Sequence, residues 1–327
     1  MTVPVHQHTD DEPVLRHPVD SLSVVVCAYT TARWDDLCRS VDSVLADDAP
    51  RLQVVVVIDH NDELYRCATR RFGADRRISV LPNSATPGLS GARNTGVQAA
   101  EGAVVAFVDD DAAVQPGWSR ALLRHYTDPR VAGVGGYAAP IWPQDRPHWM
   151  PAEFDWVVGC SYTGQPERLA AVRNPLGCNM SVRRSVLAEI GGFRSEVGRV
   201  GALPVGGEET ELFLRLRSCR PADRVLLDPA AAVRHYVSAD RATTRYFMRR
   251  CYHEGLSKAV VTRLADAPRS LDTESSYATR VLPRAAAREA LSPHRGGRAR
   301  AAMIVLGLAA TTAGYLRGAL TRQNGWT

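Results

Sequence analysis

Four short apolar segments alternate with helical segments in the first 110 residues, and no other feature of the chain constrains its fold so strongly. The apolar segments span 22–28, 53–59, 77–81 and 103–108, and the first has the β-branched composition of a strand buried on both faces. Helices are expected over 34–46 and over 90–100, and a further helix follows the second apolar segment and runs through residue 71. Repeated strand–helix–strand units predict an α/β fold with a mainly parallel, Rossmann-like sheet and helices on both faces.

Carboxylates follow two of these predicted strands. Asp59 ends the second segment, and Asp109, Asp110 and Asp111 follow the fourth. Open parallel sheets bind ligands beyond the carboxyl ends of their strands, so we expect a ligand site here. A dehydrogenase would carry GxGxxG after its first strand, but this turn reads AYTTAR, which disfavours a nicotinamide cofactor.

The aspartate triplet indicates a bound cation. Three adjacent carboxylates repel one another and raise one another's pKa unless positive charge lies among them. Alternation along a strand places Asp109 and Asp111 on one side and Asp110 on the other. Mg²⁺ and Mn²⁺ prefer oxygen ligands and commonly bridge a diphosphate to one or two carboxylates. The alternative is a solvated turn whose aspartates cap a helix.

The pattern is less regular after the fourth strand. Residues 137–177 are rich in Trp, Pro and Gly, which is typical of a substrate-shaping loop region. We expect a strand entering a helix over 179–190, a strand pair at 225–228 and 231–235, and a long helix over 243–264. A further helix begins at 206–209 and runs to about residue 217; its first acids, Glu208 and Glu209, suit the positive end of a helix dipole.

Charge is divided unevenly along the chain. Residues 1–240 contain 25 basic and 30 acidic side chains, whereas residues 241–327 contain 15 basic and 5 acidic ones, a net charge of +10. A basic tail suits nucleic acid, anionic lipid or an acidic substrate, and net charge alone does not choose among them. The tail lacks the interleaved aromatics of a nucleic-acid module, so no nucleic-acid partner is expected.

Cysteine usage and the N-terminus point to the cytoplasm. The seven cysteines form no CxxC pair, which favours reduced thiols over a disulfide framework or a zinc cage. Residues 1–20 lack the basic and apolar regions of a secretory leader and are expected to form a flexible arm.

Seven motifs, in order, resemble those of family 2 glycosyltransferases, enzymes of the GT-A fold that use a nucleotide-diphosphate sugar. They read AYT, VVVVIDHND, GLSGARNTG, FVDDDA, GCNMSVRRSVLAEIGGF, GGEETELFLRLR and LLDPAAAVRHYV. The resemblance covers roughly residues 22–237. It implies a GT-A domain at 21–240 and a basic helical extension at 241–327.

The resemblance also implies roles for single residues on the donor side. Asp59 would hydrogen-bond the nucleobase or ribose, and Arg93, in the loop before the third helix, would lie near the nucleotide or its phosphates. Asp109 would contact the sugar or ribose. The full donor-binding set is Ala28, Tyr29, Asp59, Arg93, Asp109 and Asp110. The alternatives are a helix cap for Asp59 and a solvated charge for Arg93.

The same resemblance implies which residues bind the metal and which one acts as the base. Asp111 and His235 would hold Mn²⁺ or Mg²⁺, with a UDP-sugar as the expected donor; the alternative for His235 is a structural role. The implied mechanism is inverting, with a carboxylate that removes the proton of the acceptor hydroxyl. At the position of the base the family usually has a glutamate followed by an aspartate. This chain differs, because it has two glutamates, Glu208 and Glu209. Alignment favours Glu209 as the base, Glu208 stays an alternative, and either could simply serve the helix dipole.

The acceptor side is less constrained. Residues 149–164 resemble a branch of archaeal enzymes that add hexuronic acid to dolichyl-phosphate-linked sugars. Five aromatic residues in this part form either a hydrophobic core or a sugar-stacking wall: Trp142, Trp149, Phe154, Trp156 and Tyr162. Residues 301–316 are uncharged and would span about 24 Å, less than the ~30 Å hydrocarbon core. A helix in the membrane interface, or one packed on the enzyme, is therefore expected rather than a full span.

Together these features predict an inverting, metal-dependent glycosyltransferase with a lipid-linked, polyprenyl-phosphate glycan as acceptor. We expect the protein in the cytoplasm, bound peripherally to anionic lipid at the inner face of the cell membrane. Two alternatives are a soluble transferase that acts on a polysaccharide or secondary metabolite, and a non-catalytic nucleotide-sugar binding protein.

Overall fold

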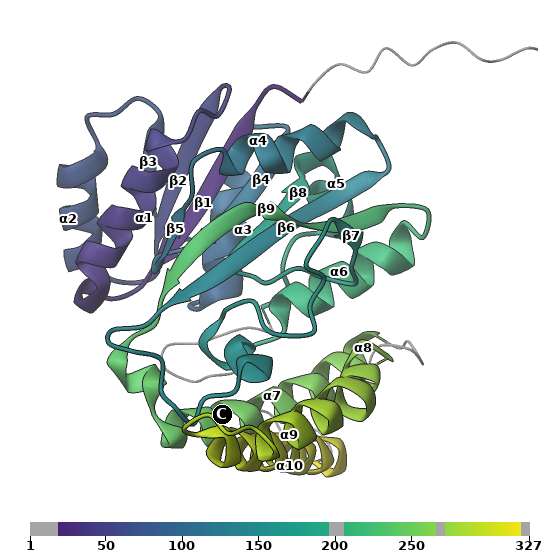
Figure 1. Cartoon of the computed structure of the whole chain (residues 1–327). Helices are drawn as coiled ribbons and strands as arrows, with labels where there is room; N and C mark the ends of the chain where they lie inside the picture. Colours follow the sequence, from purple (N-terminus) through teal and green to yellow (C-terminus); the bar gives the residue numbers. More distant parts are fainter. Residues whose placement is uncertain (1–18, 196–205, 266–271, 322–327) are drawn as a thin grey trace, which may run out of the picture.

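A nine-stranded sheet runs through the molecule in the order β3-β2-β1-β4-β8-β6-β9-β5, with β7 paired to β9 (Figure 1). The computed structural model describes residues 19–195, 206–265 and 272–321, so most of the expected N-terminal arm lies outside the described residues. The strands are β1 Leu22–Ala28, β2 Leu52–Ile58, β3 Ile78–Pro82, β4 Val104–Asp109, β5 Ala112–Val114, β6 Val131–Ile141, β7 Ala170–Ala171, β8 Asn179–Arg183 and β9 Arg224–Tyr236.

The sheet has a parallel half and a mixed half. Strands β1 to β4 are joined by parallel pairs, as the alternating sequence pattern predicts. Strand β8 then runs antiparallel to β4 and β6, and β5 runs antiparallel to β9. The predicted strand pair at 225–228 and 231–235 is wrong, because β9 is one strand that bulges where Gly136 pairs with Asp228 and Tyr137 with Ala232. The bulge accommodates Pro229, which has no N–H to donate to the sheet.

Helices cover both faces of the sheet, as predicted. Helices α1 (Trp34–Ala46), α2 (Asp62–Phe72) and α4 (Trp118–Leu123) pack on one face, and α3 (Leu89–Ala99), α5 (Arg184–Ile190) and α6 (Glu208–Cys219) pack on the other. Strand β1 contacts both layers: Val24 and Val26 face the first, and Val25 faces the second. This two-sided burial explains why its sequence is apolar throughout.

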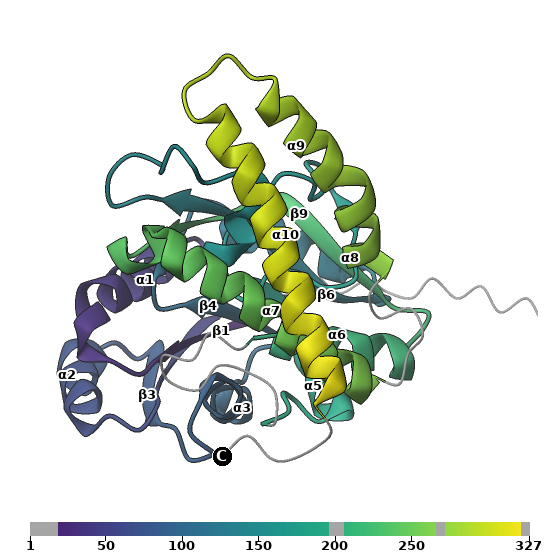
Figure 2. The same ribbon diagram turned by 90° about the horizontal axis from the view of Figure 1, so that it is seen from below.

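A third hydrophobic core lies between the sheet and a layer of C-terminal helices, which is at the bottom of Figure 1. The layer, seen face-on in Figure 2, contains α7 (Thr244–Ala265), α8 (Asp272–Ser276), a π-helix (Tyr277–Val281), α9 (Leu282–Ala290) and α10 (Gly297–Leu320). The 3-10 helix Ala152–Val158 packs against it; shorter 3-10 helices span Thr31–Arg33, Arg124–Thr127 and Ala239–Ala242. The expected loop region therefore includes ordered structure, since β6 also extends through Ile141.

The aromatic residues belong mainly to this third core. Phe154 is buried, with its ring 5.3 Å from that of Phe247 on α7, and Trp149 lies 5.8 Å from the same ring. Trp142 and Trp156 pack against the same cluster. The core interpretation is therefore confirmed for these residues, and the extension shares a core with the part of the chain that precedes it.

Helix α10 is longer than its apolar stretch. It has 24 residues and spans about 36 Å, because its ends continue into charged sequence. Its most apolar window has a mean hydropathy of 1.4, and among the described helices it alone meets the length and composition of a membrane span. Only 22% of that window is buried. Glycines hold α10 close to α7: a Cβ at Gly255 would lie 2.0 Å from the Thr311 carbonyl oxygen.

Candidate active site

The candidate site lies at the carboxyl edge of the parallel strands, which faces the helical layer (Figure 1). The ends of β1, β2 and β4 bring Ala28, Asp59 and Asp109 to this edge. Strand β9 adds His235, whose backbone pairs with Ala112 just after the aspartate triplet. Helix α6 begins nearby with Glu208. Segments far apart in the sequence therefore meet at the edge where ligands are expected.

The aspartate cluster, defined as Asp109, Asp110 and Asp111, meets His235 at the end of β4. One ligand atom each from Asp109, Asp111 and His235 lie within 4.8 Å of one another. The Nε2 atom of His235 lies 3.2 Å from Asp111 Oδ1, and its buried Nδ1 has no hydrogen-bond partner among the described residues. Two carboxylates and an imidazole form a donor set that suits Mn²⁺ and also serves Mg²⁺. The structure thus brings together the residues predicted for the metal.

Two arginines contribute positive charge to the cluster. Arg33 Nη1 lies 3.1 Å from both Asp110 Oδ1 and Asp111 Oδ2, and Arg241 Nη1 lies 3.4 Å from Asp111 Oδ2. Burial opposes ionisation of Asp111, but His235, Arg241 and Arg33 outweigh it and hold the pKa of Asp111 well below its usual value. Asp111 is therefore ionised at neutral pH.

Asp110 has a different environment. Its Oδ1 accepts from Arg33, and its buried Oδ2 has no hydrogen-bond partner in the described parts of the chain. Burial and the neighbouring Asp111 raise the pKa of Asp110 to about 7, although Arg33 opposes them. Asp110 is not one of the three clustered ligands, in agreement with the alternation expected from its position.

Asp59 is fixed at the end of β2 by polar neighbours. Its carboxylate accepts from Asn83 Nδ2 at 2.6 Å and from the Gly88 backbone N–H at 2.9 Å. The side chain that caps α2 is Asn61, so the helix-cap alternative for Asp59 is wrong. Close by, Tyr29 is 38% exposed, with its ring 5.9 Å from the Arg33 guanidinium. An exposed ring beside a fixed carboxylate is a suitable surface for a nucleoside.

Arg93 joins the aspartate cluster to the glutamate pair, defined as Glu208 and Glu209. Arg93 lies in α3 rather than in the loop before it, and its Nη1 donates to Glu208 Oε1 at 3.0 Å. Its Nη2 donates to the Gly177 carbonyl at 2.9 Å and lies 3.4 Å from Asp109 Oδ1. The solvated-charge alternative for Arg93 is therefore wrong, because the side chain is buried and paired.

The two glutamates differ in environment. Glu208 is buried and paired with Arg93, whereas its other oxygen, Oε2, has no hydrogen-bond partner among the described residues. Glu209 is half-buried. Burial, followed by the charge of Glu208, raises the pKa of Glu209 to about 7. A carboxylate with that pKa can accept a proton near neutral pH, as a general base must.

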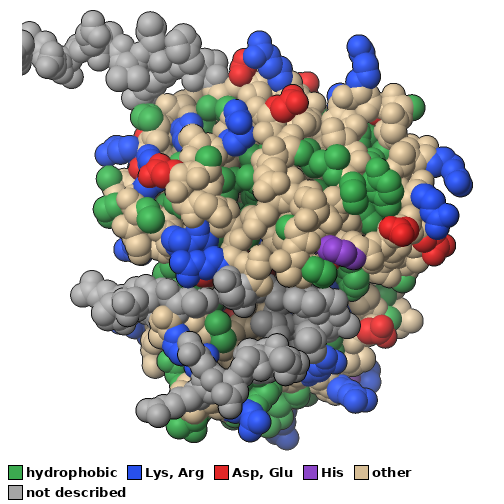
Figure 3. Space-filling view, turned by 180° about the vertical axis from the view of Figure 1, so that it is seen from behind, with side chains coloured by type: hydrophobic (Ala, Val, Ile, Leu, Met, Phe, Trp, Pro, Cys, Tyr) green, Lys and Arg blue, Asp and Glu red, His purple; other side chains and the backbone are tan. Residues whose placement is uncertain are grey.

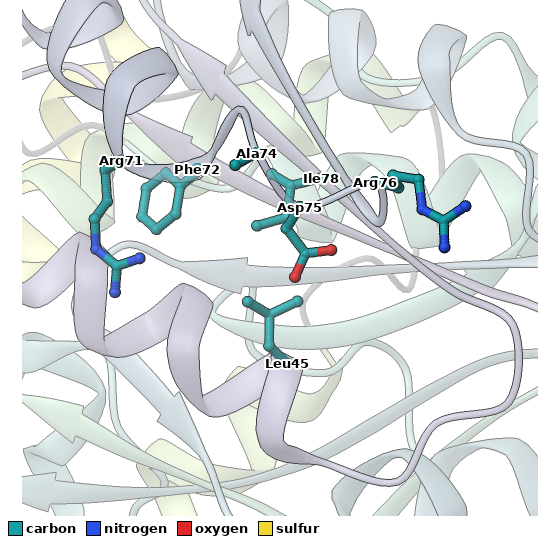
Figure 4. Close-up of a pocket in the computed structure, with 7 residues that line it drawn as sticks. All are labelled: Leu45, Arg71, Phe72, Ala74, Asp75, Arg76 and Ile78. Atoms are coloured by element: carbon teal, nitrogen blue, oxygen red, sulfur yellow. The ribbon is translucent and has the colours of Figure 1, made fainter.

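A surface hollow elsewhere is not part of this site. It has a volume of about 500 Å³ and lies between the end of α1 and the turn from α2 to β3, where Leu45, Phe72 and Ile78 surround Asp75 (Figure 4). Two of its charged side chains are paired locally, Asp75 with Arg77 and Arg71 with Asp42. The hollow therefore offers no group comparable to those at the carboxyl edge.

Sequence reasoning found Arg93 but missed the other three arginines that act at the site. Arg33 follows the first strand in AYTTAR, and its place beside a predicted ligand site was an available signal. Arg241 and Arg250 had no such signal, because they lie in the tail and reach the site only through the packing of the helical layer.

The curled α/β sheet and the acidic carboxyl edge define a GT-A glycosyltransferase. The family model described as glycosyl transferase family 2 matches residues 23–191. The glucosyl-dolichyl phosphate glucuronosyltransferase of Haloferax volcanii is 33% identical over 257 residues, which cover 78% of this chain and 81% of the relative. The chain therefore belongs to glycosyl transferase family 2.

More distant proteins are also similar, one in sequence and two in structure. The succinoglycan biosynthesis protein ExoM of Rhizobium meliloti is 23% identical over 72% of each chain. The mannosyltransferase PcManGT of Pyrobaculum calidifontis, solved with GDP-Man and Mn²⁺, has a TM-score of 0.58 at 20% identity and covers 90% of this chain and 86% of its own. GalNAc-T7, solved with UDP, GalNAc and Mn²⁺, has a TM-score of 0.53 at 18% identity, with 76% of this chain and 52% of its own covered.

Proposed function

We propose that the protein is an inverting, divalent-metal-dependent glycosyltransferase that moves a hexosyl or hexuronosyl group from a UDP-sugar to a hydroxyl of a polyprenyl-phosphate-linked glycan. The observation that carries the proposal is the convergence, at one edge of the sheet, of a donor set for a cation and a carboxylate with a pKa near 7. The glucuronosyltransferase relative, which has a lipid-linked acceptor in its name, supports the donor and acceptor classes.

Donor binding would use the aspartate cluster and the ends of β1 and β2. Asp109, Asp111 and His235 would hold Mn²⁺ or Mg²⁺, which when bound neutralises the charge of the leaving diphosphate. Asp59 would accept hydrogen bonds from the nucleoside, beside Ala28 and Tyr29. Asp110 and Arg33 would support the loop that carries the ligands, since Arg33 contacts both Asp110 and Asp111.

Glu209 would act as the base. The acceptor oxygen forms a bond to the anomeric carbon while the bond to the diphosphate breaks, and the acceptor proton passes to Glu209. Attack from the side opposite the diphosphate inverts the anomeric configuration. Glu208 is less suited to this role, because Arg93 already occupies one of its oxygens.

The helical layer would bring the lipid-linked acceptor to this edge. Helix α10 exposes large apolar side chains, with Val305 at 59%, Leu316 at 55% and Leu320 at 82%. Arg295, Arg298 and Arg317 are exposed on the same helix and the turn before it. Basic side chains lie beside hydrophobic ones at the lower end of the molecule in Figure 3, where the layer lies. A surface with both properties suits the anionic inner face of a cell membrane, and the enzyme would then act on the cytoplasmic side of that membrane.

A second candidate is a soluble transferase that extends a polysaccharide, which the similarity to ExoM favours. A purely sugar-binding role is a weaker candidate, because binding alone does not need a carboxylate whose pKa is near 7.

Donor turnover is the direct test. UDP-glucuronic acid, UDP-glucose, UDP-N-acetylglucosamine and GDP-mannose would each be incubated with the full chain and Mn²⁺, and release of the nucleoside diphosphate measured with and without a chelator. We expect chelator-sensitive release from a UDP-sugar, increased by a short-chain polyprenyl-phosphate sugar. Donor binding without release under any condition would contradict catalysis. Equal turnover with a soluble oligosaccharide acceptor would favour the polysaccharide candidate.

A further inference from the structure

Arg93 lies at the centre of the carboxyl edge and is only 2% exposed. Its guanidinium carbon is 5.7 Å from the ring centroid of Phe107 on β4 and 5.4 Å from that of Phe193. A Cβ added at Gly177 would lie 3.1 Å from Arg93 Nη2, so the chain also approaches it closely from a third side. Packing therefore restrains this guanidinium in one place, and a planar, restrained cation is well suited to hold two carboxylates in fixed relative positions.

The two carboxylates that Arg93 contacts belong to the two halves of the reaction. Asp109 Oδ1, on the donor side, lies 3.4 Å from Nη2, and Glu208 Oε1, on the base side, lies 3.0 Å from Nη1. The side chain of Asp109 is 32% exposed, whereas that of Glu208 is 7% exposed. A buried carboxylate without a cation is costly, so Glu208 depends on Arg93 far more than Asp109 does.

We propose that Arg93 is a positioning residue that joins the donor side of the site to the base, because one guanidinium holds both Asp109 and Glu208. With Glu208 held and charge-compensated in this way, Glu209 is the carboxylate of the glutamate pair left to take the acceptor proton. This inference rests on the proposed function and deepens it by assigning Arg93 and Glu208 to the support of the base rather than to the phosphates or to proton transfer.

The charges around Glu209 make the inference testable. Four charged groups in the described part of the chain act on it: Glu208 from α6, Arg93 from α3, and Arg250 and Glu254 from α7. Glu208 and Glu254 favour the protonated form of Glu209, and the two arginines favour its ionised form. Since Glu208 and Arg93 oppose each other, removing only Glu208 and then also Arg93 moves the ionisation of Glu209 in opposite directions.

The experiment compares the pH dependence of kcat in the full-length wild type, Glu208→Gln, and the double variant Arg93→Met/Glu208→Gln, at saturating Mn²⁺ and UDP-sugar. Glu208→Gln keeps the shape of the side chain and removes its charge. The acid limb of the profile, which is the fall of kcat at low pH, should therefore move to lower pH by about half a unit or more. Adding Arg93→Met should move it back to higher pH by a similar amount. The double variant Arg93→Lys/Glu208→Gln keeps the positive charge at residue 93. Its acid limb should therefore lie at the same pH as that of Glu208→Gln, with a lower kcat.

A merely structural Arg93 would lower kcat at every pH and leave the acid limb in place. The proposal would therefore be overturned if the acid limb lay at the same pH in Glu208→Gln and in Arg93→Met/Glu208→Gln. If the double variant does not fold by circular dichroism, an unmoved limb in Glu208→Gln alone would overturn it. Failure of the proposed function is distinct, since the wild type would then show no Mn²⁺-dependent turnover, or Glu209→Gln would keep wild-type turnover and its acid limb.

Discussion

The aspartate cluster and the glutamate pair lie at one edge of the sheet, and their surroundings give them opposite properties. Asp111 lies within 3.4 Å of nitrogen atoms from Arg33, His235 and Arg241. Among the described residues, the glutamate pair has one direct ion pair, between Arg93 and Glu208, and it does not extend to Glu209. The first cluster is therefore surrounded by positive charge, and the second is only partly compensated.

The difference shows how carboxylates of similar intrinsic acidity obtain separate roles. The pKa of Asp111 is well below its usual value, because its charged neighbours outweigh burial. The pKa of Glu209 is about 7, because burial and Glu208 outweigh Arg93. A permanently ionised carboxylate suits a cation, and one that gains a proton near neutrality suits proton transfer.

Asp111→Asn should have the largest effect and tests the first half of the comparison. It removes an ionised ligand but keeps the side-chain shape, so Mn²⁺-dependent donor binding should be lost while the circular dichroism stays native. Calorimetric titration of UDP-sugar with and without Mn²⁺ measures this. Asp48→Asn is the matched control, because the Asp48 side chain is 95% exposed and far from the cluster in the fold. Metal-dependent affinity equal to that of wild type would remove Asp111 from the site.

Glu209→Gln tests the second half. It should preserve donor binding and lower kcat by roughly 10² to 10⁴ fold, the range that loss of a general base costs. Glu208→Gln should lower kcat less. Glu63→Gln is the control, since Glu63 is an exposed acid in the first turn of another helix. If Glu208→Gln had the larger effect, the base would be Glu208 and the comparison would need to be reversed.

The pH dependence of wild type should follow Glu209. Below pH about 7 this carboxylate keeps its proton, so kcat should fall about tenfold for each further unit of pH. The raised pKa also means that the folded state binds this proton more tightly than the unfolded state does. The resulting stabilisation is fully present below the usual value of 4.5 and is lost as pH rises through about 7. Denaturant unfolding at pH 5 and pH 8 should show a larger loss for wild type than for Glu209→Gln; equal losses would contradict the shift.

The smallest expected effect concerns the exposed face of α10 that we propose as the membrane-binding surface. Truncation of α10 would be a poor test, because Met303 and Ile304 belong to the third core. The double variant Leu316→Ser/Leu320→Ser should weaken sedimentation with acidic liposomes about tenfold, since each leucine contributes on the order of 1.5–3 kcal/mol when fully buried and these insert only in part.

Leu169→Ser is the control for that measurement, because Leu169 is 52% exposed in a loop outside the helical layer. Rising salt should weaken binding of the wild type, since arginine attraction to anionic lipid is screened over about 8 Å at physiological ionic strength. Equal binding of wild type and the double variant would limit α10 to its packing role.

Local patterns were sufficient for much of the fold and for half of the site. The apolar run at β1 and the helical spacing of α1 depend on neighbours in the sequence, and both elements have the predicted bounds. The aspartate cluster could be found for the same reason, since its residues are adjacent. His235 was found through its motif and lies beside Asp111 as expected.

Only the tertiary structure decided which charges meet. Arg93 and Glu208 are 115 residues apart, and nothing near either residue in the sequence indicates that they pair. The same holds for Arg241, which reaches Asp111 from the start of the tail. A sequence pattern reports burial and backbone preference, which are local, whereas the acidity of a carboxylate depends on burial and on charges within a few ångströms. The sequence therefore determined which carboxylates stand at the edge of the sheet, and folding decided which remain ionised and which can take a proton.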